Sequence, residues 1–206
     1  AAAPAWLGEP RVVAYRRENR DFVAVAPAGP ATFTWTALAD GGVRLDYEFS
    51  YDGDADVLGL GFALPESAML AKRWLGRGPY RVWQNRLEGT WIGVHANTFN
   101  DATPGETYAY PEFKGYFRDW RWLDLRTPAG VIRVENDSGV PYFGLGRPRD
   151  GVNGLLRLPD VGLAFLEVIP PLRDKFISAE KLGPQSQTRR VTGAHRGTLT
   201  FRLSPP

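Results

Sequence analysis

Apolar and polar residues alternate strictly along several short stretches of the chain. From Val43 to Ser50 every second residue is charged or polar, and residues 32–37 and 198–203 show the same period. A period of two places successive side chains on opposite faces of a strand, and strands with one apolar face are typical of antiparallel sheets. Further strands are predicted over residues 11–17, 20–26, 57–64, 68–75, 90–95, 117–125, 130–135 and 161–169.

Turn residues separate these strands, and helical periodicity is confined to one predicted turn near residues 178–182. The chain contains 23 Gly and 17 Pro. Gly and Asp tolerate the positive φ of tight turns, so Asp40-Gly41-Gly42 and Tyr51-Asp52-Gly53-Asp54 are predicted hairpin turns. Many short strands divided by turns indicate an all-β antiparallel sandwich, which we expect to form one domain over residues 1–206.

Composition indicates a folded domain and argues against several classes of binding partner. Hydrophobic residues make up 43% of the chain and aromatic residues 13%, as expected of a folded domain. The net charge of +2 comes from 25 basic and 23 acidic residues that are interspersed, which argues against nucleic-acid binding. No apolar run reaches the roughly 18 residues of a membrane span. The absence of Cys excludes disulfides and thiolate metal sites.

The first eight residues have the composition of a linker. Residues 1–8 are rich in Ala and Pro and do not begin with Met. We therefore expect a linker remnant or a processed end at 1–8 and a domain that comes from a multidomain protein. The cellular compartment stays open.

The sequence contains no complete catalytic or metal-binding motif. Asp52, Asp54 and Asp56 have the opening spacing of a calcium loop, but Val57 stands where that loop needs its Gly. His95 and His195 lack motif spacing, and each is expected to be a structural or a surface residue. We predict no catalytic residue, no metal ligand and no cofactor.

Carboxylates do not form a recognisable hydrolytic pair either. Glycoside hydrolysis uses two carboxyl groups about 5 to 9 Å apart. Glu88, Asp101, Glu106 and Glu112 lie in the central region, but their spacing does not place any two on one wall.

Aromatic residues concentrate between Trp74 and Trp122, interleaved with Arg, Asn and Glu. Rings that stack on sugars, with planar polar groups that reach hydroxyls, are typical of carbohydrate contacts. The same composition fills sandwich cores and protein interfaces, and both interpretations stay open. The candidate carbohydrate or interface residues are Arg77, Tyr80, Trp83, Asn85, Arg86, Glu88, Tyr110, Glu112 and Lys114.

One further expectation concerns the end of this region. Arg121 lies between Trp120 and Trp122, so a regular strand would place both rings on one face and Arg121 on the other. Trp122 is then expected in the core.

Three ordered motifs carry a resemblance to a known family. Trp74-Leu75-Gly76-Arg77-Gly78-Pro79 is similar to the W-L-G-x-G-P pattern of the C-terminal β-supersandwich domain, or small chain, of family 2 β-galactosidases. Trp83-Gln84-Asn85-Arg86 stands where that family commonly shows Y-x-D-R, and Asp119-Trp120-Arg121-Trp122-Leu123 is similar to D-V-R-W-L. The chain departs from the family in having no Trp after Trp122 and in the stretch 110–115.

The resemblance implies an antiparallel β-supersandwich of the galactose mutarotase-like type. It implies a non-catalytic C-terminal domain of a glycoside hydrolase, whose partner is the catalytic TIM-barrel domain of the parent chain. Loops 77–88 and 97–116 are then expected to rim the sugar cleft of the barrel, with a carbohydrate as a candidate ligand. Two alternatives are a stand-alone carbohydrate-binding module and an aldose mutarotase-like epimerase.

Overall fold

The computed structural model describes residues 2–99, 115–148, 157–172 and 181–205. These residues form an all-β, antiparallel structure, as the alternation predicts. The helical elements in the described residues include single 3₁₀ turns at Glu66–Ala68 and Pro184–Ser186. In the part of the chain that the structure describes, no helix is long and apolar enough to cross a membrane.

In the described residues, twelve strands belong to one hydrogen-bonded sheet that folds over on itself. They are β1 (Pro10–Glu18), β2 (Asp21–Ala24), β3 (Thr32–Ala37), β4 (Val43–Ala55), β5 (Val57–Phe62), β6 (Ala71–Val82), β7 (Trp91–Thr98), β8 (Tyr116–Thr127), β9 (Gly130–Asn136), β10 (Tyr142–Leu145), β11 (Leu163–Val168) and β12 (Arg189–Ser204).

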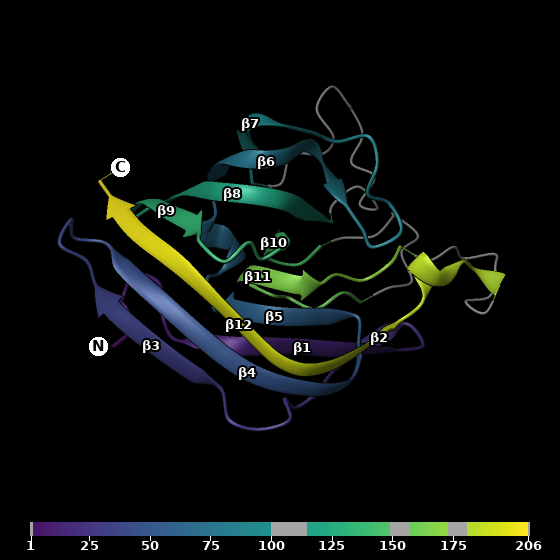
Figure 1. Cartoon of the computed structure of the whole chain (residues 1–206). Helices are drawn as coiled ribbons and strands as arrows, with labels where there is room; N and C mark the ends of the chain where they lie inside the picture. The colour runs from purple at the N-terminus through teal and green to yellow at the C-terminus, as the bar shows by residue number, and fades with distance from the viewer. Residues whose placement is uncertain (1, 100–114, 149–156, 173–180, 206) are drawn as a thin grey trace.

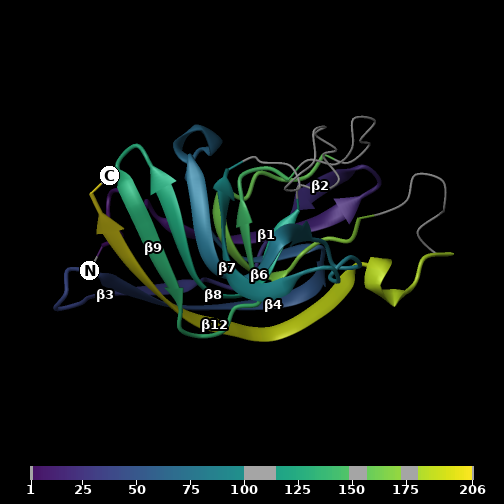
Figure 2. The ribbon, with the colours of Figure 1, turned by 90° about the horizontal axis from the view of Figure 1, so that it is seen from above.

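The sheet forms two layers that diverge from β8 (Figure 1). One layer, called here the front layer, runs β9-β12-β4-β3, and the other, the back layer, runs β10-β11-β5-β1-β2. Along one edge of β8, Phe117 and Arg118 pair with β10, whereas residues 122–127 pair with β9. The opposite edge of β8 pairs with β6, and β6 pairs with β7 (Figure 2). The two layers therefore share β8 as their common strand.

An aromatic core fills the space between the layers. Phe201 of the front layer lies 5.4 Å from Phe62 and 6.0 Å from Phe165 of the back layer, measured between ring centroids. Trp120 stacks on Phe165 with centroids 5.1 Å apart. Burial of large rings on both inner faces supplies most of the driving force for such a sandwich.

A second apolar cluster covers the outer side of the back layer. It contains Val57, Trp83, Tyr116, Ala164 and Leu166, all of them buried. Apolar residues in β5, β10 and β11 are consequently buried on both faces, which explains why these strands do not alternate.

Several predicted elements are confirmed and others need correction. The strand at 32–37 and the turn at Asp40-Gly41-Gly42 are present, with Gly41 at a φ of 84°. The predicted turn at 51–54 is wrong, because β4 continues through it and pairs with β12 as far as Ala55. Strand β10 and the first half of β12 were not predicted, and most of the predicted helical turn at 178–182 lies outside the described residues.

Candidate functional site

Two of the sequence motifs meet face to face on β6 and β8. Leu75 pairs with Trp122 and Arg77 pairs with Arg118, so Gly76 alone stands opposite residues 119–121. This is a β-bulge, and Asp119 within it has a φ of 50°. A Cβ on Gly76 would lie 2.8 Å from the Cα of Trp120, so only glycine fits against the bulged backbone.

The bulge reverses the expected orientation of Trp122. Trp120 points into the core between the layers, whereas Trp122 is only half-buried on the outer face. There the guanidinium carbon of Arg133 lies 4.0 Å from the centre of its ring. The prediction that both rings share one face is therefore wrong, because the extra residues of the bulge shift the period of two between them.

Asp119 ties the bulge to its neighbours. Its carboxylate accepts hydrogen bonds from Nε of Arg77 at 2.9 Å and from Nε of Arg118 at 3.0 Å. Arg77 also donates from Nη1 to the carbonyl of Thr90 at 3.0 Å, just before β7 begins. Exposed ion pairs of this kind contribute little stability singly, so their main effect here is to position the β6–β7 hairpin on β8.

Close packing makes the base of this hairpin rigid. A Cβ on Gly78 would lie 2.6 Å from the His95 ring and 2.7 Å from the Trp74 ring. The indole of Trp74 donates from Nε1 to the carbonyl of Arg77 at 3.1 Å. The peptide bond between Gly78 and Pro79 is cis. The W-L-G-R-G-P motif thus carries glycines where a neighbouring backbone or ring occupies the space of a side chain.

The outer strand of the hairpin exposes an apolar surface. Among the described strands β7 pairs only with β6, and it leaves Trp91 55%, Ile92 59% and Val94 53% exposed. Tyr80 packs edge-on against Trp91, with centroids 6.2 Å apart. These four residues are called the β7 edge below. Natural sheets usually protect an exposed edge with charges or Pro, and exposed apolar clusters mark contact surfaces.

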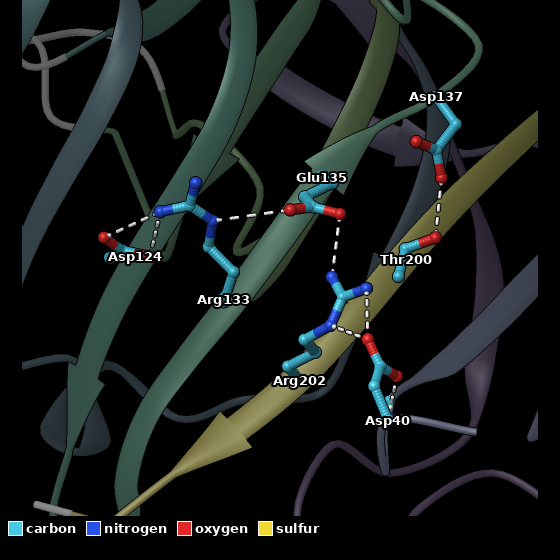
Figure 3. Close-up of polar contacts among 8 residues, drawn as sticks. Asp40, Asp124, Arg133, Glu135, Asp137, Thr200 and Arg202 are labelled. Carbon is cyan, nitrogen blue, oxygen red and sulfur yellow. Dashed lines mark hydrogen bonds and ion pairs between the residues drawn. The ribbon is translucent and has the colours of Figure 1, made fainter. Parts of the chain in front are cut away.

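The outer face of the front layer carries charged side chains, in contrast to the apolar β7 edge. Figure 3 shows that Arg202 contacts both Asp40, at 2.8 Å, and Glu135, at 2.7 Å. The backbone N–H of Gly42 and the Arg202 guanidinium lower the pKa of Asp40. Arg133 lies 3.9 Å from Glu135 and 2.9 Å from Asp124, so it extends the same row of charges. This polar face shows that the apolar exposure of the β7 edge is not general over the surface.

Two of the predicted candidates make contacts within the chain, and Asn85 is only partly buried. Trp83 is fully buried and packs edge-on against Tyr116, with centroids 5.7 Å apart. The side chain of Asn85 donates to the carbonyl of Leu172 at 2.7 Å and to Oγ of Ser186 at 2.8 Å, and it accepts from the Leu172 N–H. Asn85 thus holds the segments at Leu172 and Ser186 in place, whereas Trp83 belongs to the second apolar cluster.

The remaining candidates divide between the surface and the undescribed residues. Arg77 and Tyr80 belong to the hairpin, and Arg86 and Glu88 are exposed in the connection between β6 and β7. Tyr110, Glu112 and Lys114 lie outside the described residues. Trp91, Ile92 and Val94 are not among the candidates predicted from the sequence. The apolar pair 91–92 could have indicated this surface. It lies within a predicted strand, and a strand with one face in solvent would alternate between apolar and polar residues.

His195 lies away from the hairpin. Its Nδ1 is 2.5 Å from the carboxylate of Glu167, and its ring stacks on Phe49 with centroids 5.1 Å apart. Because β12 and β4 belong to the front layer and β11 to the back layer, this contact joins the two layers. Of the two roles expected for His195, the structural one agrees with that position.

Comparison with known proteins places these motifs in a family. The family model described as "Beta galactosidase small chain" matches residues 9–162, well over half of the chain. This chain belongs to the β-galactosidase small chain family. The match includes both facing motifs and the β7 edge. The supersandwich expected from the resemblance is the fold of this family, and β11 and β12 complete it beyond the matched residues. A comparison with curated proteins found no match.

Proposed function

We propose that this chain is the accessory small-chain domain of a family 2 β-galactosidase and that it binds the catalytic large chain through the β7 edge. Membership of the small chain family carries the proposal, because a small chain is one part of a β-galactosidase. The partner is then a catalytic chain with the complementary surface.

The β7 edge supports this docking because it exposes both apolar side chains and the backbone groups of an edge strand. Its apolar side chains Trp91, Ile92 and Val94 are more than half exposed. Its outward backbone groups belong to an edge strand, which offers hydrogen bonds to an added strand. Aromatic and aliphatic residues at the centre of an interface contribute most of the binding energy.

The rigid base of the hairpin supports the same function. Arg77 on β6 binds both Asp119 of β8 and Thr90, which comes just before β7, so the edge is presented in a fixed orientation. A fixed surface loses less conformational entropy on binding. Exposed Arg86 and Glu88, beside the hairpin, are the described residues that we propose to face the sugar cleft of the partner.

The test is assembly with the catalytic large chain of the same β-galactosidase, produced as a separate polypeptide. The dissociation constant is measured by analytical ultracentrifugation, together with hydrolysis of a chromogenic β-galactoside. Substituting both Ile92→Lys and Val94→Lys is expected to weaken assembly by about tenfold or more and to lower the assembled activity in proportion.

Leu203→Lys is the matched control, because Leu203 is also an exposed apolar residue but lies at the far end of β12. It should assemble like the parent chain. Equal assembly by the double variant would rule out the β7 edge, and failure of the parent chain to assemble at all would reject the accessory role.

A further inference from the structure

A hollow of about 430 Å³ lies on the outer face of the front layer, away from the β7 edge. Its lining residues come from β3, β4 and β12, with Ser138 from the connection between β9 and β10. Strands β3 and β7 lie at opposite ends of the strand arrangement (Figure 1). The hollow is therefore independent of the proposed docking surface.

The strand register arranges the lining as two polar rows across three strands. Thr32 pairs with Glu48, which pairs with Arg196 on the other side. Thr34, Asp46 and Thr198 form the adjacent row in the same way. Neighbouring strands lie about 4.8 Å apart and alternate residues about 6.7 Å apart, so six polar side chains form a regular grid.

Contacts within the grid leave part of its hydrogen-bonding capacity unused. Arg196 donates to Glu48 at 2.9 Å, and the Thr198 hydroxyl donates to Asp46 at 2.7 Å. Within the described part of the chain, the hydroxyls of Thr32 and Thr34 make no hydrogen bond to protein. Ser138, which donates from Oγ to the Thr198 carbonyl at 3.2 Å, closes one end.

The floor of the hollow is backed by a packed ring. Tyr47 lies on the inner side of β12, where its hydroxyl oxygen is 2.3 Å from the position of a Cβ on Gly197. The ring thus occupies the space of the missing side chain. Because that space is filled, the strand backbone beneath the grid is held in place.

We propose that this grid is a binding site for a neutral saccharide. Hydroxyls, carboxylates and a guanidinium in one hollow match the donors and acceptors of a polyol. The carboxylates of Asp46 and Glu48 disfavour a phosphate or another anion.

The test is a titration of the ¹⁵N-labelled 206-residue chain with lactose, cellobiose and maltose, followed by backbone amide shifts. At least one disaccharide is expected to shift amides of β3, β4 and β12 at millimolar concentrations. Thr34→Val keeps the side-chain shape and removes the hydroxyl. It is expected to weaken binding by about three- to tenfold.

Thr36→Val is the matched control, since Thr36 is exposed on the same strand but does not line the hollow. It should leave the dissociation constant unchanged. Shifts confined to residues 77–88, equal effects of the two valine variants, or no shifts with any of the three sugars would each overturn the proposal. None of these results depends on assembly with a large chain.

Discussion

Trp120 and Trp122, two residues apart on β8, lie on opposite faces of the sheet. Trp120 is buried between the layers and stacks on Phe165, whereas Trp122 lies outside beneath Arg133. Residues 119–121 bulge against Gly76 and separate the two rings. The bulge also lies where β8 exchanges β10 for β9 as its neighbour, so it marks the point at which the two layers diverge.

The two tryptophans should therefore differ in their effect on stability. Trp120→Ala is expected to lower the free energy of unfolding by about 3–5 kcal/mol, because it leaves a cavity in the core. Trp122→Ala should cost about 1–2 kcal/mol, since the ring is half exposed and loses mainly its guanidinium contact. Denaturant unfolding of both variants measures the difference, and equal midpoints would contradict the assigned faces.

Gly76→Ala should destabilise the fold by about 1–3 kcal/mol, because the added methyl meets the backbone of Trp120. Gly29→Ala is the matched control. A Cβ at Gly29 meets nothing within 4 Å, so this variant should be neutral or stabilised by up to about 1 kcal/mol. Thermal unfolding of the pair would disprove the tight bulge if both variants behaved like the parent chain.

Asn85→Ala should release the segment that contains Leu172. The substitution removes two donors and one acceptor that bind Leu172 and Ser186, and a loss of about 1–3 kcal/mol is expected. Hydrogen exchange should show faster exchange of the Leu172 amide. Glu88→Ala, at an exposed position, should change neither quantity, and protection of Leu172 in the Asn85 variant would argue against the anchoring role.

Tyr116 makes stability sensitive to alkaline pH. Burial raises the pKa of its phenol well above the ordinary value near 10, so the folded chain keeps a proton that the unfolded chain loses. Above about pH 10 the unfolded state binds fewer protons, and stability falls as pH rises. Tyr116→Phe should reduce this loss, as measured by urea midpoints from pH 8 to pH 11.

The same variant has an expected outcome at neutral pH. Within the described residues, the Tyr116 hydroxyl is buried without a hydrogen-bond partner. Its removal should therefore leave stability at pH 7 unchanged or raised. An unchanged alkaline slope together with a large loss at pH 7 would mean that the hydroxyl is hydrogen-bonded.

Much of the strand pattern was readable from the residues alone. Alternation at 32–37 and 43–49 identified which side chains face the core, and β3 and β4 confirm it. The first half of β12 shows no such signal, because Gly193 and Gly197 interrupt it. Its pairing with β4 is a long-range contact that local sequence does not encode.

By itself the sequence determined the fold class, the inward face of each alternating strand and the family motifs that locate the hairpin. These follow from a side-chain period that is a local property of an extended chain. The tertiary structure alone decided where β8 bulges, which strand stays at the edge, and that Trp83 and the partly buried Asn85 make structural contacts. The reason is that each of these depends on which distant strand or segment lies alongside, and burial is set by those neighbours.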